Sequence, residues 1–192
     1  MSFFAMDLSK VAVVLLAGGQ QTRFLEITDS IPKAMIGIGM RQRPSLEYLV
    51  NHLLAAGVGK IVIVAGFLSP VIMEHFFDWD RRGVKILFDP EGQKIDTGGA
   101  FRLALMELLQ SGAMYDHVMY WNPDTLIQLN VQHLYQRHVL SGAASTVVLT
   151  TDSSAPNFGA VEVGADGMII SFDESRKLRS SRILHFDQYA HA

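Results

Sequence analysis

Two short apolar runs constrain the fold more than any other feature of this sequence. VAVVLLA over Val11–Ala17 and KIVIVAG over 60–66 are apolar without alternation, as expected of strands that are buried on both faces. Between them, PSLEYLVNHLLAAG has apolar residues at helical spacing, begins with Pro44 and Ser45, and stops at Gly57. Buried strands joined by a helix predict a parallel β-sheet that helices cover.

The same alternation continues along the chain. We expect a short helix at SPVIMEHFF, strands over 84–88, 117–121 and 145–150, and a helix over 131–140. A loop through DPEGQKIDTGGA should open into the helix AFRLALMELLQSG, which Gly112 ends. GAVEV and MIISF flank GADG, which is a hairpin signal.

These elements predict an α/β fold with a mostly parallel central sheet, helices on both faces and a small β-hairpin near the C-terminus. We expect a single domain over residues 1–192. Within it, residues 1–10 would be an N-terminal extension and residues 175–192 a poorly patterned tail.

Composition narrows the class of protein. With 192 residues, of which 49% are hydrophobic and 18% charged, the chain can bury a substantial core. A net charge of −3 gives no basic field for nucleic acid, and no cysteine is present for disulfides or thiolate metal sites. No apolar run approaches the ~18 residues of a membrane span, and MSFFAMDLSK lacks the pattern of a signal peptide. We therefore expect a cytoplasmic protein that binds neither nucleic acid nor a membrane.

Loops with chemically useful side chains follow three predicted strands. After the first strand come Gly18, Gly19, Thr22 and Arg23, with Lys33 further along the chain. DTGGA follows the third strand, and NPDT follows the fourth. Ligands of open α/β sheets bind outside the carboxyl ends of the strands. The three loops are therefore expected to converge on one site.

The residue types in these loops suit a nucleoside triphosphate. Glycines let the backbone approach phosphate oxygens, while Arg23 and Lys33 offer positive charge for them. Asp124 stands at a strand end, where one carboxylate can hold Mg²⁺ if phosphates supply other ligands. Taken singly, each residue is as readily a turn residue, a solvated side chain or a helix cap. The order of these residues along the chain and their placement after strand ends together favour a nucleotide-binding site.

The first loop resembles the opening motif of the sugar-1-phosphate nucleotidylyltransferases, approximately L-A-G-G-x-G-T-R-L-x-P-L-T-x-x-x-P-K. The stretch LAGGQQTRFLEITDSIPK keeps in register Leu16, Ala17, Gly18, Gly19, Thr22, Arg23, Thr28, Pro32 and Lys33. The loop DPEGQKIDTGGAFRLAL is similar to the base-recognising loops of N-acetylmuramate-1-phosphate uridylyltransferases and heptose-1-phosphate guanylyltransferases.

The resemblance continues to about residue 174. WNPDT resembles the family's N-G-D segment, whose Asp binds magnesium, and FGAVEVGADGMIISFDES is similar to its segment near the sugar. Because the family typically continues beyond this point, the resemblance predicts a chain that is shortened at its C-terminal side.

The resemblance implies a Rossmann-like nucleotidyltransferase fold and a Mg²⁺-dependent reaction of an NTP with a sugar 1-phosphate, giving an NDP-sugar and pyrophosphate. It implies Arg23 and Lys33 as catalytic residues and Asp124 as the metal ligand. The nucleotide-binding residues that it implies are Leu16, Ala17, Gly18, Gly19, Gln21, Thr22, Thr97, Gly98 and Gly99. The sugar-binding residues are Asn122, Gly159 and Glu174.

The identity of the base stays open at this point. Glu91 and Asp96 could accept hydrogen bonds from a base edge, which would suit guanine, but the loop is as similar to those of uridylyltransferases. UTP and GTP are therefore both retained as substrates. A homo-oligomer, which is frequent in the family, is retained as well.

The chain departs from the family pattern at three positions. The second glycine of the loop is Gln21, the glycine of N-G-D is Pro123, and the lysine after Glu174 is Ser175. These departures keep an alternative open, namely a relative of little or no activity that binds a nucleotide or sugar phosphate in a regulatory role. A dinucleotide-dependent oxidoreductase is disfavoured, because GGQQTR is not G-x-G-x-x-G and no acidic residue ends the second strand.

Overall fold

The computed structural model describes residues 6–18, 30–66, 68–88, 96–124, 129–149, 160–173 and 189–191. The chain forms two compact units, Met1–Gln128 and Leu129–Ala192, and each is described by itself. The expectation of one domain over the whole chain stays a prediction.

A four-stranded sheet with the strand order β5-β4-β1-β6 forms the centre of the first unit. Its strands are β1 (Val11–Ala17), β4 (Lys60–Ala65), β5 (Val84–Phe88) and β6 (His117–Trp121). Every neighbouring pair is parallel. The two central strands, β1 and β4, are buried over most of their length, which confirms the prediction from their unbroken apolar runs.

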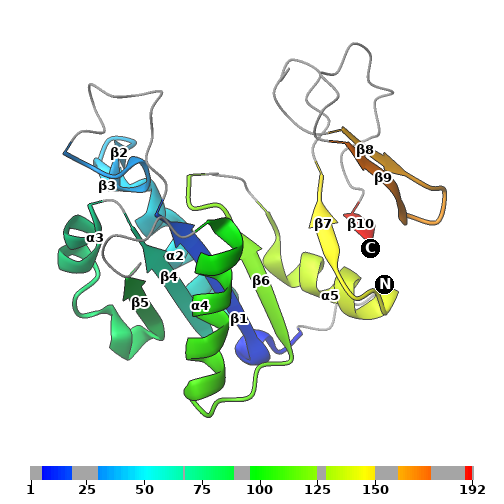
Figure 1. The fold of residues 1–192 in the computed structure, drawn as a ribbon, viewed down its shortest axis with the longest axis horizontal. Coiled ribbons are helices and arrows are strands. Elements are labelled where there is room, and N and C mark those ends of the chain that lie inside the picture. The colour runs from blue at the N-terminus through cyan, green and yellow to red at the C-terminus, as the bar shows by residue number, and fades with distance from the viewer. Residues whose placement is uncertain are drawn as a thin grey trace. The chain divides into compact units, whose positions relative to one another are not determined.

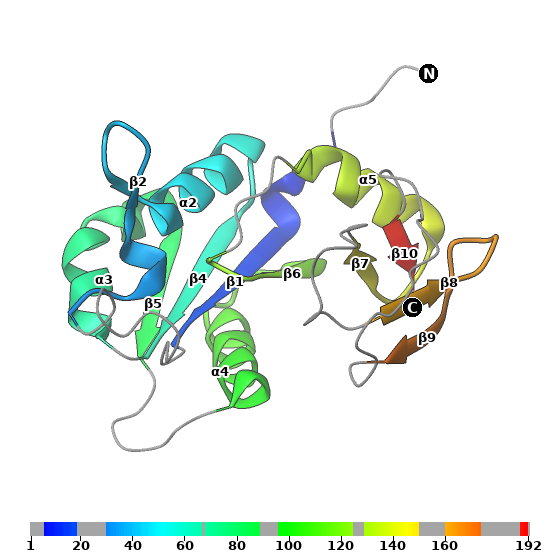
Figure 2. The same cartoon turned by 90° about the horizontal axis from the view of Figure 1, so that it is seen from above.

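Helices cover both faces of this sheet, with α2 (Ser45–Ala56) on one side and α4 (Thr97–Gln110) on the other (Figures 1 and 2). Under α4, two helix residues pack against buried residues of β1 and β4; this cluster consists of Ala12, Val14, Val62, Val64, Ala104 and Leu108. The first unit also contains α3 (Ser69–His75), the 3-10 turns η1 (Leu8–Lys10), η2 (Lys33–Met35) and η3 (Trp79–Arg82), and the hairpin of β2 (Gly37–Ile38) and β3 (Arg43–Pro44).

Helix α4 begins earlier than the sequence predicts. The expected loop through DTGGA ends at Asp96, and the helix begins at Thr97. Asp96 is the N-cap, and its Oδ1 accepts a hydrogen bond of 2.7 Å from the backbone N–H of Gly99. A good cap offsets the low helix propensity of two glycines in the first turn. Gly98 and Gly99 are therefore helical residues rather than loop residues.

The second unit contains α5 (Val131–Ser141) and two short antiparallel pairs. Strands β8 (Ala160–Val163) and β9 (Ile169–Asp173) form the expected hairpin. The predicted strand over 145–150 is shorter, and in the described residues it does not extend the parallel sheet: β7 (Thr146–Val148) pairs with β10 (Tyr189–His191). Its Val147 and Val148 are each 39% exposed, so this strand lacks the two-sided burial of β1. None of the described helices has the length and apolar character that a membrane span requires.

Candidate functional site

A cavity of about 290 Å³ lies at the carboxyl ends of β1, β4 and β6, beside the start of α4. The predicted site residues that line it are Leu16, Ala17, Gly18, Lys33, Thr97, Asn122 and Asp124. The structure thus brings together side chains and backbone from three predicted loops, as expected of strand ends in a parallel sheet.

The remaining predicted residues fall into two groups. Gly98 and Gly99 lie in the first turn of α4 and are not part of the cavity lining. Outside the described residues lie Gly19, Gln21, Thr22, Arg23, Thr28, Glu91, Gly159, Glu174 and Ser175. Their roles stay predictions.

Lys33 and Asp124 meet across the cavity although 91 positions separate them in the sequence. The Lys33 Nζ lies 2.8 Å from the Asp124 Oδ2, and the two side chains are 34% and 33% exposed. An ion pair with that exposure contributes at most about 1 kcal/mol to stability. Its chemical consequence is larger, because it places an ammonium and a carboxylate side by side where a ligand can reach both.

Lys33 and Asp124 are positioned by two short, well-anchored segments. Lys33 begins η2 directly after the buried Pro32. Asp124 follows β6 in the stretch Asn122-Pro123-Asp124, in which Pro123 is buried while its two neighbours are exposed. A buried proline with its fixed φ anchors the loop and turns the flanking polar side chains outward. Pro123 is therefore compatible with a site built from Asn122 and Asp124.

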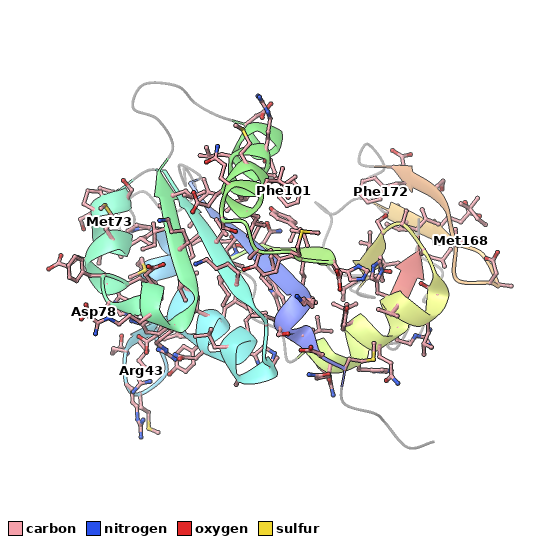
Figure 3. All side chains as sticks on the ribbon, turned by 90° about the horizontal axis from the view of Figure 1, so that it is seen from below. Arg43, Met73, Asp78, Phe101, Met168 and Phe172 are labelled. Carbon is pink, nitrogen blue, oxygen red and sulfur yellow. The ribbon has the colours of Figure 1, made fainter. Side chains whose placement is uncertain are left out.

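Sequence reasoning missed Tyr120, which also lines the cavity. Its hydroxyl donates a hydrogen bond to the Asn122 Oδ1. Its ring makes an edge-on contact with Phe101 of α4, with centroids 6.1 Å apart and planes at 88° (Figure 3 labels Phe101). Burial, followed by the negative charge of Asp124, raises the pKa of Tyr120 above its ordinary value, so the hydroxyl stays protonated. Alternation in HVMYWN puts Tyr120 and Asn122 on the same side of the strand, and this signal could have identified it.

Gly66 is a second residue that sequence reasoning did not assign to the site. It follows β4 just as Gly18 follows β1. A Cβ built on Gly66 would lie 2.7 Å from the Gly18 Cα and 2.8 Å from the Gly18 O. The two backbones can therefore run this close beside the cavity only if residue 66 has no side chain.

A Gly66→Ala variant is expected to lose about 1–3 kcal/mol of stability, the usual cost of overpacking, because backbone atoms of Gly18 must move. Thermal denaturation measures this loss as a lowered Tm. The matched control is Gly98→Ala, since a Cβ there would meet only the Asp96 Oδ1, at 3.6 Å. That control should be neutral or slightly stabilising, because alanine is the better helix residue. Equal Tm values for Gly66→Ala and the wild type would contradict the packing argument.

Comparison with known proteins finds a family match over most of the chain. Residues 12–189 match the family described as Nucleotidyl transferase. A D-glycero-alpha-D-manno-heptose 1-phosphate guanylyltransferase of Aneurinibacillus thermoaerophilus is 26% identical over 161 residues, which are 84% of this chain and 66% of that protein. A UTP--glucose-1-phosphate uridylyltransferase of Synechocystis sp. is 30% identical over 169 residues, which are 84% of this chain and 43% of that protein. The chain thus spans 43–66% of the length of these two curated relatives.

Solved structures show the same fold. HddC from Yersinia pseudotuberculosis, also solved in complex with GMP-PN, has a TM-score of 0.60 at 23% identity and covers 85% of this chain and 68% of its own. A putative glucose-1-phosphate thymidylyltransferase from Bacillus anthracis has a TM-score of 0.70 at 17% identity and covers 94% of this chain and 68% of its own. Since the family match extends over nearly the whole chain, the protein belongs to the nucleotidyl transferase family.

Proposed function

We propose that this protein transfers a nucleotidyl group from an NTP to a sugar 1-phosphate, which gives an NDP-sugar and pyrophosphate. The observation that carries the proposal is the meeting of Lys33, Asp124 and the end of β1 in one cavity. The names of similar proteins support it, since they include a guanylyltransferase, a uridylyltransferase and a probable cytidylyltransferase of sugar 1-phosphates.

In this reaction an oxygen of the sugar phosphate attacks the α-phosphorus of the NTP. A new P–O bond forms as the bond between the α-phosphorus and the bridging oxygen breaks, and pyrophosphate leaves with that electron pair. Such transfers depend mainly on positioning and on stabilising charge at the phosphoryl oxygens. The Lys33 ammonium supplies positive charge in the cavity, and Arg23 holds the leaving pyrophosphate.

The cavity has donors that suit Mg²⁺. The described residues contain no group of three or more His, Cys, Asp or Glu side chains that could hold a metal ion. Magnesium bound beside phosphates needs only one or two protein carboxylates, and Asp124 is a partly exposed carboxylate in the cavity lining. We therefore assign Asp124 as the ligand of Mg²⁺, which would act as a Lewis acid on phosphate oxygens when bound.

The remaining contacts divide between the nucleotide and the sugar. We assign the nucleotide to the end of β1 and the start of α4, through Leu16, Ala17, Gly18, Gly19, Gln21, Thr22, Thr97, Gly98 and Gly99. We assign the sugar to Asn122, Gly159 and Glu174. We propose GTP or UTP as the nucleotide; similar proteins named as guanylyl- and uridylyltransferases support these two, and another is named as a probable cytidylyltransferase. Asp96 lines the cavity and caps α4 through its Oδ1, so its second carboxylate oxygen is the one we assign to a base. We place the reaction in the cytoplasm, where NTPs are made.

The test is pyrophosphate release with Mg²⁺, each of ATP, CTP, GTP and UTP, and a panel of glucose, mannose, heptose and N-acetylmuramate 1-phosphates. Release from one pair that is lost in an Arg23→Ala variant supports the proposal and identifies the substrates. Nucleotide binding by calorimetry without release from any pair would overturn it in favour of a regulatory binding protein.

A further inference from the structure

The side-chain amide of Asn122 is held by Tyr120. The Tyr120 hydroxyl donates to the Asn122 Oδ1, and both residues line the cavity. An asparagine amide has one accepting oxygen and one nitrogen with two donor protons. Because the oxygen faces the phenol, the nitrogen with its two protons is the end of the amide that is turned away from Tyr120.

The Tyr120 ring is itself fixed in place. Phe101 of α4 meets it edge-on, and the first residues of the same helix, Thr97 and Ala100, line the cavity beside it. The ring is nevertheless 44% exposed, so it is supported on one side and open on the other. Because the pKa of Tyr120 is raised, its hydroxyl remains a donor rather than an acceptor-only phenolate. The orientation of the amide is thus set by a protonated neighbour that Phe101 contacts on one side.

We propose that Tyr120 is a positioning residue that orients Asn122 so that its amide nitrogen donates to a hydroxyl oxygen of a sugar ring. This inference rests on the proposed function for its sugar-containing substrates. A hydroxyl oxygen accepts a hydrogen bond well, and an amide free to rotate by half a turn would present an acceptor as often as a donor. The observed hydrogen bond from Tyr120 to the Asn122 Oδ1 favours the orientation with the nitrogen turned away from the phenol, so its loss weakens sugar recognition without removing any group that touches the phosphates.

The assignment of Asn122 above makes the sugar of the sugar 1-phosphate the expected partner, and the ribose of the NTP is the other sugar ring that carries hydroxyl groups. Analogues distinguish the two. If the ribose is the partner, removing its 2′- or 3′-hydroxyl lowers the affinity of the wild type for the NTP. The Tyr120→Phe substitution then causes no further loss of affinity for that deoxy NTP. If the other sugar is the partner, deoxy sugar 1-phosphates behave in that way instead.

The experiment compares Tyr120→Phe, Asn122→Ala and the double variant with the wild type. Tyr115→Phe is the matched control, because Tyr115 packs against the core under α4 and is not part of the cavity lining. We expect Tyr120→Phe to raise the KM of one sugar substrate by about two- to tenfold, the cost of one net hydrogen bond, with a smaller change in kcat. Asn122→Ala should raise the same KM, and the double variant should be no worse than Asn122→Ala alone.

A second readout needs no turnover. In the NMR spectrum of the ligand-free protein, Tyr120→Phe should shift the side-chain amide resonances of Asn122, and Tyr115→Phe should leave them in place. If the wild type releases no pyrophosphate, the proposed function fails, and calorimetric affinities for GTP, UTP and the sugar 1-phosphates replace the KM values in the same comparison.

Three outcomes would overturn the inference. The first is an unchanged KM or affinity in Tyr120→Phe beside an active wild type, in which case the proposed function stands and only this inference fails. The second is additive effects in the double variant, which would mean that Tyr120 acts independently of Asn122. The third is a wild type that binds neither an NTP nor a sugar 1-phosphate, in which case both proposals fail.

Discussion

An Asp124→Asn variant is expected to lose pyrophosphate release by at least about a hundredfold in kcat/KM, or about 2.7 kcal/mol of transition-state stabilisation. The substitution keeps the size of the side chain but removes the negative charge that Mg²⁺ requires of a carboxylate ligand. The fold should persist, because the ion pair with Lys33 is one-third exposed and such pairs contribute at most about 1 kcal/mol. Steady-state assays with the best substrate pair and a thermal melt measure the two effects separately.

The control for Asp124→Asn is Asp116→Asn. Asp116 is an exposed residue directly before β6, at the opposite end of the strand that leads to Asp124. Its neutralisation should leave pyrophosphate release unchanged. Should Asp124→Asn retain activity within about threefold of the wild type, well inside one tenfold step of about 1.4 kcal/mol, Asp124 would not be the metal ligand.

A Lys33→Met variant is expected to lower kcat by about 10²- to 10³-fold, the range found when a preorganised donor to developing charge is removed. Methionine keeps the unbranched chain but has no ammonium to place beside the phosphates. Single-turnover and steady-state measurements with the same substrate pair report the loss.

Two companion variants sharpen the Lys33 experiment. Lys33→Arg keeps the charge but replaces a compact ammonium with a planar fork, so it should recover part of the lost rate. Lys85→Met is the control for a lost lysine, since Lys85 is 42% exposed and its Nζ lies 3.8 Å from the Glu107 Oε1, away from the cavity lining. A Lys33→Met enzyme as active as Lys85→Met would show that the charge at position 33 plays no part in catalysis.

Much of the candidate site could be predicted because its residues follow strand ends. The sequence shows Gly18 and Asp124 directly after predicted strands and Lys33 in the loop that follows the first strand. The structure places all three beside one cavity. Asp96 shows the limit of such reasoning. The sequence offered it as a partner for a base, which stays a prediction, and Asp96 does line the cavity. What the sequence did not offer is that its Oδ1 caps α4, since a carboxylate before a helix satisfies N–H groups that are otherwise unpaired.

The sequence by itself determined the central strands β1 and β4, the helix α2 with its end at Gly57, and the family resemblance of the first loop. These features are local, because an apolar run, a helical period or a glycine stop is written in neighbouring residues. Tertiary structure alone decided that Lys33 meets Asp124 from 91 positions away, that residue 66 must be glycine to let the Gly18 backbone pass, and that Phe101 of α4 contacts Tyr120. It also decided that β7 pairs with β10. Each of these depends on where separate elements come to lie in space, and no local pattern of residues encodes that.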